Sequence, residues 1–222
     1  MSFSRALKEK TKKIWEDGYN HPFVQGLGSG NLDKESFKFY LIQDYIYLLE
    51  YAKVFAKGAI KAKSEFLMAK FTEAQYGILC NEMSLHREYM KEYGINAEEV
   101  EEAKQSLFNR AYTSNMMAVA ETGDVTEILA VVFPCAWTYH DYATRLKEQY
   151  KDNLEGNFYR SWIESYAGDE FKESFDWFYD EIDRQCKNKT EEELIRLEEI
   201  FEMGVQMEYL FWDMAYKQKM SY

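Results

Sequence analysis

Apolar side chains recur along this chain at intervals of three and four residues, the spacing that gathers them on one face of an α-helix. Sustained alternation of apolar and polar residues, the signature of a half-buried strand, is almost absent. No Asn-Gly or Asp-Gly turn lies between β-branched runs. The pattern predicts an all-α fold, with eight or nine helices in a single domain over residues 1–222.

The clearest helix begins after Asp33, a plausible N-cap, and is expected to extend to about Lys63. Its inward stripe consists of Phe37, Tyr40, Leu41, Asp44, Tyr47, Leu48, Tyr51 and Phe55. Thr190 and Glu193 form a capping box that opens the last helix, to about Lys219. Other helices are expected at about residues 3–15, 64–92, 125–150, 157–167 and 169–187. Asn96 is expected to open a short acidic helix, and the stretch that begins at Asn109 is expected to be a connection followed by a helix that ends at Gly123. His21-Pro22 is expected to end a segment.

Composition narrows the class of protein. A chain of 222 residues that is 46% hydrophobic and 17% aromatic can bury a large core and is not disordered. A net charge of −12 repels nucleic acid and anionic lipid, so neither is an expected partner. No apolar stretch is long enough to span a membrane, and the N-terminal residues lack the apolar run of a signal peptide. The three cysteines are scattered and odd in number. We therefore expect a reducing, cytoplasmic location.

The stretch "VVFPCAWTYH" (131–140) places a proline and a cysteine side by side within an apolar, helix-like pattern. Pro134 has no N–H to donate, and if the helix restarts there, Cys135 lies in a first turn whose free N–H groups favour a thiolate. Tyr139 shares its face, whereas His140 lies roughly 140° around the helix and is poorly placed as a partner. The alternative is a buried structural cysteine beside a kink.

Two carboxylates lie among aromatic residues. Asp44 and Tyr47 point the same way from one helix, and Glu208 has Phe211 and Trp212 three and four residues later. Burial favours the protonated form of such a glutamate and suits it to moving protons. Asp44 is either functional or simply held by polar partners. Glu208 is either a proton-transfer residue or a paired residue on the helix surface.

A metal site has weaker support. Glu82 and His86, together with His140, invite a di-iron interpretation, but that chemistry requires two Glu-x-x-His pairs and two further carboxylates. Here the spacing is Glu-x-x-x-His and it occurs once. Cys80 and Cys186 are expected to be packing or surface residues, and His21 to make structural hydrogen bonds.

Several fragments together resemble thiaminase II, the TenA family of thiamin-salvage aminopyrimidine hydrolases. They are "HPFVQGLGSG", "FYLIQDYIYLLEYAKV", "NEMSLHREY", "AYTSNM", "EILAVVFPCAWTYHDYA", "WIESYAGDEF" and "MEYLFWDMAY", in this order over almost the whole chain. The resemblance implies a heme-oxygenase-like fold and a homotetramer, with neither a metal nor an organic cofactor. It also implies hydrolysis of 4-amino-5-aminomethyl-2-methylpyrimidine to hydroxymethylpyrimidine, with thiamin as a second substrate.

The resemblance assigns catalytic roles to matching positions. Cys135 is the implied nucleophile that adds to the pyrimidine ring, and Glu208 is the implied acid and base, oriented by Tyr47. The alternatives left open are a pyrimidine-binding or thiamin-binding protein of the same fold without turnover, and a metal-dependent oxidase.

The resemblance also implies how the ring is bound. Asp44 is expected to hydrogen-bond the amino group and a ring nitrogen of the aminopyrimidine. Tyr112 and Tyr139 place hydroxyl groups around the thiol and the ring. Tyr166 and Phe211 stack on the two faces of the ring.

Overall fold

The computed structural model describes residues 2–221, which form helices and loops but no strand. The α-helices are α1 (Phe3–Lys10), α2 (Lys12–Tyr19), α3 (Pro22–Ser29), α4 (Lys34–Lys61), α5 (Glu65–Tyr76), α6 (Met83–Glu92), α7 (Ala97–Glu101), α8 (Leu107–Thr122), α9 (Val125–Gln149), α10 (Arg160–Tyr166), α11 (Asp169–Phe175), α12 (Trp177–Cys186) and α13 (Glu191–Lys217). A π-helix, η1 (Gly77–Glu82), joins α5 to α6. The all-α prediction is confirmed, although eight or nine helices was too few for the described residues.

Contacts divide the chain into two compact units. Unit 1 comprises the N-terminal residues up to Asp33 together with Leu129–Asp213, and unit 2 comprises Lys34–Ile128 together with the C-terminal residues from Met214. The single domain over residues 1–222 stays a prediction.

Several helix boundaries differ from the sequence-based prediction. The first expected helix is divided at Thr11, and the expected helix at residues 169–187 is divided at Asp176. His21-Pro22 follows the end of α2 and also begins α3, because Pro22 takes the first helical turn and His21 Nδ1 accepts the Phe23 N–H at 3.1 Å. The structural hydrogen-bonding role predicted for His21 is confirmed.

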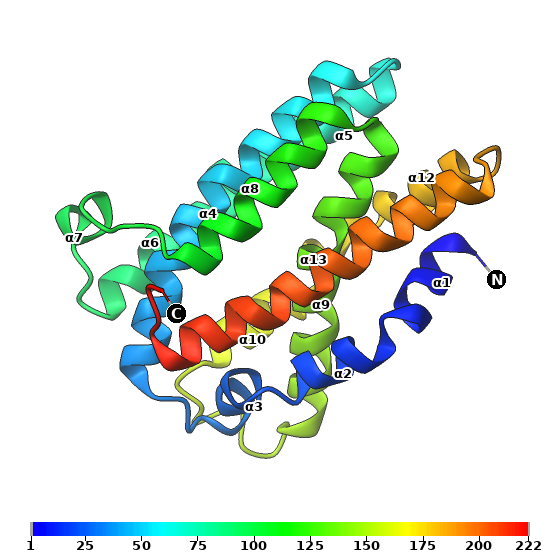
Figure 1. Ribbon diagram of the computed structural model, residues 1–222. Coiled ribbons are helices and arrows are strands. Elements are labelled where there is room, and N and C mark those ends of the chain that lie inside the picture. The colour runs from blue at the N-terminus through cyan, green and yellow to red at the C-terminus, as the bar shows by residue number, and fades with distance from the viewer. Residues whose placement is uncertain (1, 222) are drawn as a thin grey trace. The chain divides into compact units, whose positions relative to one another are not determined.

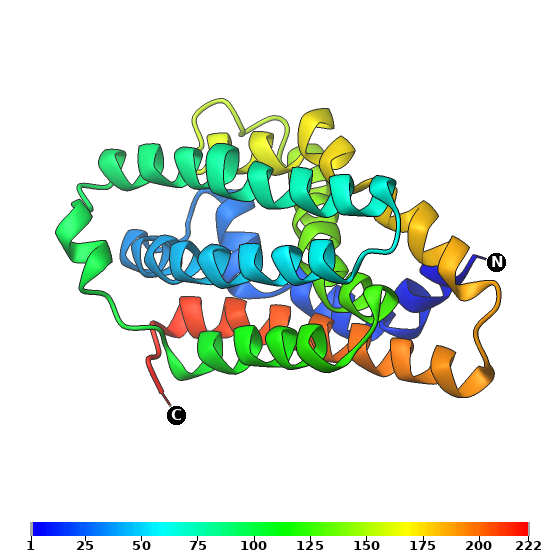
Figure 2. The ribbon, with the colours of Figure 1, turned by 90° about the horizontal axis from the view of Figure 1, so that it is seen from above.

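Unit 2 is organised around α4, which contacts α5, η1, α6 and α8. Figure 2 shows α4 lying between the α5–α6 segment and α8, and Figure 1 labels the same helices. Every residue of the predicted inward stripe, from Phe37 to Phe55, is buried. Gly58 lets α5 approach closely, since a Cβ atom there would lie 2.4 Å from the Phe71 ring. The amphipathic pattern thus identified the central helix and its buried face.

The π-helix η1 changes which face of the α5–α6 segment meets α4. Leu67, Phe71 and Ile78 are buried up to that point, and His86 and Met90 are buried beyond it. In an unbroken α-helix His86 would lie about 100° away from Leu67, because each residue turns the helix by about 100°. One extra residue in a π-helical turn offsets that rotation. The segment can therefore bury both groups of residues against α4.

In unit 1 the carboxylate of Asp141 ties α9 to α1 and α2. Asp141 Oδ1 accepts a hydrogen bond from Lys8 Nζ at 2.7 Å, and Oδ2 accepts one from Trp15 Nε1 at 2.8 Å. Burial alone would raise the pKa of Asp141, but the hydrogen bonds from Lys8 and Trp15, helped by the charge of Arg145, lower it below its usual range. The folded state therefore favours the ionised form.

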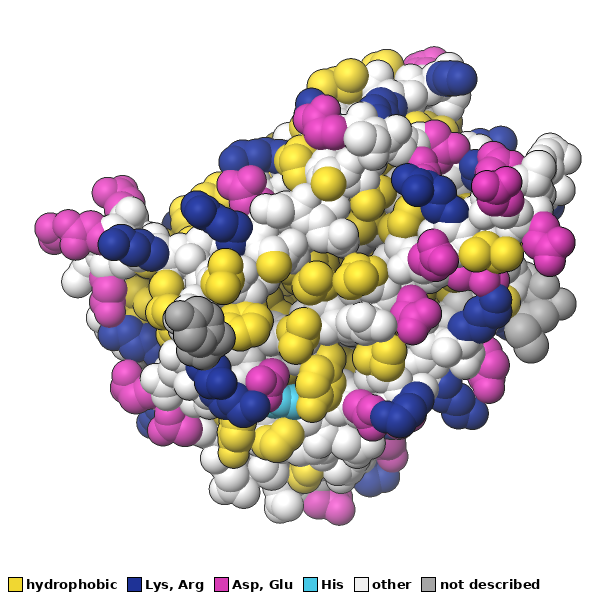
Figure 3. Space-filling view, viewed as in Figure 1, with side chains coloured by type: hydrophobic (Ala, Val, Ile, Leu, Met, Phe, Trp, Pro, Cys, Tyr) yellow, Lys and Arg dark blue, Asp and Glu magenta, His cyan; other side chains and the backbone are white. Residues whose placement is uncertain are grey.

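Figure 3 shows acidic and basic side chains interspersed over the face that is viewed, with apolar side chains between them. Most of the ion pairs in the described part of the chain involve at least one largely exposed side chain, such as that between Lys13 and Asp17. Such pairs stabilise the fold little. Within residues 2–221, no helix has the length and apolar character needed to cross a membrane.

Replacing Asp141 with Asn should lower the free energy of unfolding by about 1–3 kcal/mol at neutral pH, because the charged acceptor of hydrogen bonds from Lys8, Trp15 and Arg145 is lost. A lowered folded-state pKa means that this stabilisation is present above the unfolded pKa and disappears as pH falls through the folded pKa. Urea unfolding at neutral pH and under acidic conditions measures both effects. Asp17→Asn, a change at a half-exposed ion pair, is the matched control and should alter stability little. Equal stability of Asp141→Asn and wild type at neutral pH would contradict this account.

Candidate active site

Helix α9 continues through Pro134 without interruption. The predicted restart of the helix at this residue is therefore wrong, and Cys135 lies in the interior of a helix instead of in a first turn. Pro134 still lacks an N–H for the Ala130 carbonyl, and a proline in a helix interior costs about 3 kcal/mol. Both residues are buried, so the packing of α9 in the core outweighs this cost.

Helix α13 approaches α9 closely at the proline. A Cβ atom added to Gly204 would lie 2.5 Å from Pro134 Cγ and 3.2 Å from its Cβ, so only a glycine lets the two helices pack at this distance. Cys135 follows Pro134 directly, and Glu208 lies one turn beyond Gly204 on the same side of α13. The contact therefore brings together the parts of α9 and α13 that carry the predicted nucleophile and the predicted acid and base.

Unit 1 contains five of the predicted site residues, and all five are buried. The exposed fraction is 8% for Cys135, and the others are Tyr139, Tyr166, Glu208 and Phe211. The ring centroids of Tyr139 and Tyr166 lie 4.9 Å apart in an edge-to-face arrangement. The structure thus places the thiol and the carboxylate in an apolar, aromatic interior.

Further rings join α9, α10 and α13 around Tyr139. Trp212 of α13 lies 5.0 Å from Tyr139, and Trp162 of α10 lies 5.8 Å from it. Phe211 contacts the edge of Trp212 at 6.4 Å. Rings that pack in this way hold one another rigidly and offer apolar faces to a flat ligand. The stacking of a ring between Tyr166 and Phe211 stays a prediction.

The charge of Glu208 acts on Tyr142, one turn beyond the predicted site on α9. Burial raises the pKa of Tyr142 well above its usual value, and the negative charge of Glu208 raises it further. The Tyr142 hydroxyl donates to the Trp15 carbonyl at 2.8 Å. Tyr142 therefore stays protonated and remains a donor to the Trp15 carbonyl.

His140 has a structural contact of its own. Its Nδ1 atom lies 2.9 Å from the carbonyl oxygen of Tyr166, at the end of α10. This contact agrees with the geometric argument against a Cys135–His140 pair, since the imidazole holds the α10 terminus.

Unit 2 contains Asp44, which has two partners that the sequence did not reveal. His86 Nε2 lies 2.6 Å from Asp44 Oδ2, and the Tyr40 hydroxyl donates to the same oxygen at 3.2 Å. Tyr40 is four residues before Asp44 on α4, so the helical spacing could have found it. His86 comes from α6, forty-two residues later, and no local pattern signals that contact.

His86 contacts Asp44 and the backbone of Glu82, so its surroundings do not support the interpretation of Glu82 and His86 as metal ligands. The Nδ1 atom of His86 lies 3.2 Å from the backbone carbonyl of Glu82. Burial on its own lowers the pKa of His86, but the hydrogen bond to Asp44 and its negative charge outweigh burial, so the pKa is raised. Across residues 2–221, no group of three or more His, Cys, Asp or Glu side chains is arranged to hold a metal ion.

Tyr47 and Tyr112 contact each other in unit 2. Their ring centroids lie 5.1 Å apart, and Tyr47 also stacks on Tyr51 at 5.3 Å. The Tyr47 hydroxyl reaches the Met116 sulfur at 3.8 Å. Both predicted tyrosines are buried, so α4 and α8 present an aromatic surface beside Asp44. The orienting role of Tyr47 toward the glutamate stays a prediction.

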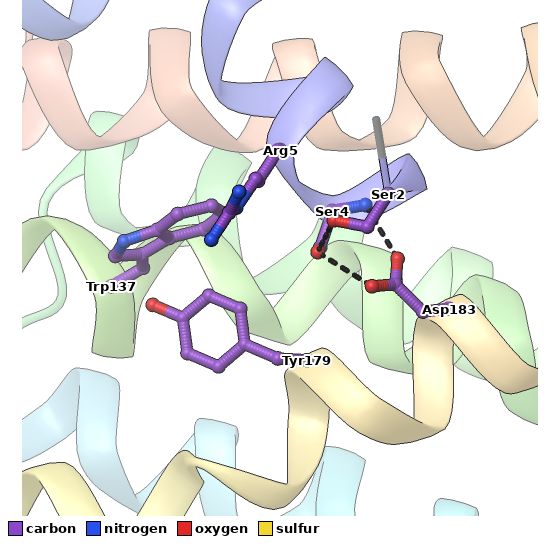
Figure 4. Close-up of a pocket in the computed structure, with 6 residues that line it drawn as sticks. All are labelled: Ser2, Ser4, Arg5, Trp137, Tyr179 and Asp183. Atoms are coloured by element: carbon purple, nitrogen blue, oxygen red, sulfur yellow. Dashed lines mark hydrogen bonds between the residues drawn. The ribbon is translucent and has the colours of Figure 1, made fainter.

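A pocket of about 450 Å³ lies elsewhere in unit 1 (Figure 4). It is lined by Ser2, Ser4, Arg5, Trp137, Tyr179 and Asp183. Figure 4 shows the Trp137 and Tyr179 rings on one side and the Asp183 carboxylate, which accepts from Ser4, on the other. Trp137 follows Cys135 by two residues, which places it about 160° around the helix from the thiol. None of the eight predicted site residues lines this pocket.

Comparison with known proteins gives the family. The sequence model described as the TENA/THI-4/PQQC family matches residues 8–218. The chain belongs to this family. An aminopyrimidine aminohydrolase of Halalkalibacterium halodurans is 43% identical over 99% of this chain and 98% of its own. The resemblance found from the motifs is confirmed.

Solved structures support the same assignment. The TenA homologue from P. horikoshii OT3 has a TM-score of 0.87 and 30% identity, covering 98% of this chain and 99% of its own. Heme oxygenase-1 of Synechocystis, at 17% identity, has a TM-score of 0.60 and covers 96% of this chain and 91% of its own. This distant similarity concerns the fold alone, and it confirms the heme-oxygenase-like architecture expected of a TENA/THI-4/PQQC member.

Replacing Gly204 with Ala should destabilise the protein by about 1–3 kcal/mol, because the new methyl group overlaps the Pro134 ring and neither helix can yield freely. Activity should also fall, since the strain acts on the residue before Cys135 and one turn before Glu208. Urea unfolding and steady-state kinetics measure the two effects. Gly156→Ala, where a Cβ atom meets nothing within 4 Å, should leave both unchanged. A Gly204→Ala protein with wild-type stability would show that the helices are not in close contact there.

Proposed function

We propose that this protein is an aminopyrimidine aminohydrolase of thiamin salvage. It releases ammonia and hydroxymethylpyrimidine from 4-amino-5-aminomethyl-2-methylpyrimidine, and it also cleaves thiamin at the same methylene carbon. The observation that carries the proposal is the burial of Asp44, Cys135 and Glu208 among aromatic rings, in a chain 43% identical to a relative that bears this name. Burying carboxyl groups in apolar surroundings is costly unless they are paired or hydrogen-bonded, so the presence of two of them there supports a functional role.

A neutral aminopyrimidine matches these surroundings chemically. Its flat ring gains from stacking on the faces of Tyr166 and Phe211, and its amino group donates hydrogen bonds that a carboxylate such as Asp44 accepts. Hydroxyl groups of Tyr112 and Tyr139 provide further polar contacts at the edge of the ring. Apolar walls with a few fixed polar groups are typical of small-molecule sites.

The reaction begins when the Cys135 sulfur adds to a ring carbon and the proton of the thiol passes to a ring nitrogen. This addition removes the aromaticity of the pyrimidine, so electrons from the ring can expel the amine from the neighbouring methylene. Glu208, oriented by Tyr47, supplies the proton with which the amine leaves. Covalent addition thus replaces one difficult displacement with easier steps.

Water completes the reaction. Glu208, now a carboxylate, removes a proton from water, and the hydroxyl group adds to the exocyclic methylene carbon. The Cys135 sulfur then leaves, the ring nitrogen returns its proton, and the aromatic ring is restored. One C–N bond is broken and one C–O bond is formed, with no change of oxidation state. With thiamin, the thiazolium nitrogen is the leaving group instead of ammonia.

The proposal extends to the organisation of the protein. We place the reaction in the cytoplasm, in a homotetramer whose chains each act as one catalytic domain over residues 1–222. The family resemblance supports the tetramer, and the scattered cysteines and acidic composition support the location. The proposed chemistry needs neither a metal nor an organic cofactor.

Cys135→Ser and Glu208→Gln should each reduce kcat for ammonia release by at least about 100-fold, because each removes a group that acts in the covalent or proton-transfer steps. Ammonia release by the purified protein, with aminomethylpyrimidine as substrate, measures this. Thr138→Ser, a buried position on α9 close to Cys135, is a matched control and should keep most of the activity. Full activity in both site variants would refute the assigned roles. A tight pyrimidine complex without any turnover in wild type would instead indicate a binding protein.

Thiol labelling gives a second test, because the three cysteines differ in exposure. Cys80 is exposed, whereas Cys135 and Cys186 are buried, so accessibility alone favours Cys80. An activated Cys135 should nevertheless react fastest with iodoacetamide in the native protein, since the thiolate is the reactive form. Bound hydroxymethylpyrimidine should slow labelling at Cys135 alone. Peptide mass spectrometry over a time course measures each rate, and faster labelling of Cys80 in the native protein would count against an activated nucleophile.

A further inference from the structure

The contact between Asp44 and His86 joins two ionisable groups in the interior of unit 2. The exposed fraction is 2% for Asp44 and 0% for His86, and His86 Nε2 lies 2.6 Å from Asp44 Oδ2. An ionised carboxylate in such a place needs partners, because burial strongly disfavours an uncompensated charge. The Tyr40 hydroxyl is a weaker second donor to the same oxygen, at 3.2 Å.

The contact of the other ring nitrogen, Nδ1, shows where the protons of the His86–Asp44 pair lie. His86 Nδ1 lies 3.2 Å from the Glu82 carbonyl oxygen, and a carbonyl oxygen can only accept a hydrogen bond. Nδ1 therefore carries a hydrogen. One further proton lies between Nε2 and Oδ2, which makes the pair either imidazolium with carboxylate or imidazole with carboxylic acid. The raised pKa of His86, for which Asp44 outweighs the opposing effect of burial, favours imidazolium with carboxylate.

The charge state of Asp44 matters for the ligand that it meets. The amino group of an aminopyrimidine donates hydrogen bonds, so it needs an acceptor, and an ionised carboxylate is an acceptor at both oxygens. A protonated carboxyl group would keep its carbonyl oxygen as an acceptor, but its other oxygen would become an O–H donor, which suits an unprotonated ring nitrogen instead of an amino group. Two donors on Oδ2 also fix the plane of the carboxylate, and with it the direction in which it can accept from a ligand.

We propose that His86 is a positioning residue for substrate recognition: through its contact with Asp44 it keeps that carboxylate ionised and oriented to accept from the 4-amino group of the pyrimidine. The inference rests on the proposed function and deepens it, since it assigns recognition of the amino group to a pair of residues. The π-helix η1 contributes, because its last residue, Glu82, supplies the carbonyl that holds His86 Nδ1.

The experiment compares two ligands that differ only in the amino group. Calorimetry measures the Kd of hydroxymethylpyrimidine and of the same pyrimidine without its 4-amino group, and kinetics measures KM and kcat for the aminomethylpyrimidine. The variants are His86→Leu, which removes the donor and the charge, His86→Gln, which retains an amide donor, and Tyr40→Phe, which removes the longer hydrogen bond to Asp44.

His86→Leu should raise the Kd of the amino ligand and KM about 10-fold or more, the size expected for losing a charged hydrogen bond. It should leave the Kd of the ligand without the amino group nearly unchanged, and kcat should fall much less than KM rises. His86→Gln should recover part of the loss, and Tyr40→Phe should have the smallest effect, because its hydrogen bond is longer and uncharged. If His86→Leu does not fold, His86→Gln carries the same comparison.

Met90→Ala is the matched structural control, since Met90 is buried one turn beyond His86 on α6. It should lower the Tm without changing the preference for the amino ligand. Equal losses for both ligands in His86→Leu, or the same selective loss in Met90→Ala, would overturn the positioning role and leave a general packing role.

The result also separates this inference from the proposed function. If wild type binds the amino ligand selectively and the His86 variants keep that selectivity, the inference fails and the function stands. If wild type neither binds hydroxymethylpyrimidine nor releases ammonia, the proposed function fails and the inference fails with it.

Discussion

The close approach of α9 and α13 at Pro134 and Gly204 determines where the reactive groups of unit 1 can lie. A glycine has no side chain to keep two helices apart, and the proline ring occupies the space that a side chain would need. Residues next to this contact are held in fixed positions, because a helix is stiff over a single turn. Cys135 is adjacent to the proline, and Glu208 is one turn from the glycine. Their spacing therefore depends on a contact that involves neither the thiol nor the carboxylate.

Unit 2 meets a different constraint, which is electrostatic. Asp44 lies among aromatic residues on the buried side of α4, where an unmatched charge would be costly. His86 and Tyr40 supply the compensation through one oxygen atom. A site built in this way has its carboxylate ready before a ligand arrives, so less binding energy is lost in ordering it.

The sequence predicted the features that depend on local spacing. The stripe of α4 from Phe37 to Phe55 follows from the 3.6-residue period, and the capping box at Thr190 correctly marked the start of α13. The eight candidate residues came from motifs, and the structure shows all of them buried. Their roles depend on chemistry that spacing alone does not contain.

Features that depend on packing could not be predicted. The penalty for proline suggested a break at Pro134, but the buried surface of α9 outweighed it. The contact between His86 and Asp44 joins residues forty-two positions apart, so no window of sequence contains both. His86 was instead weighed with Glu82, its neighbour on one helical face. The actual contact with Glu82 is to its backbone carbonyl, which a side-chain pattern cannot reveal.

The π-helix η1 rotates the residues of α6 about the helix axis relative to those of α5. Because one extra residue rotates all that follows by about 100°, the partners of α6 are selected by the length of the chain before it as well as by its side chains. Removing a single residue from Gly77–Glu82 would turn His86 away from α4 without altering any residue of α6. Relatives could therefore differ in ligand preference through an insertion or deletion there while keeping every side chain of the site.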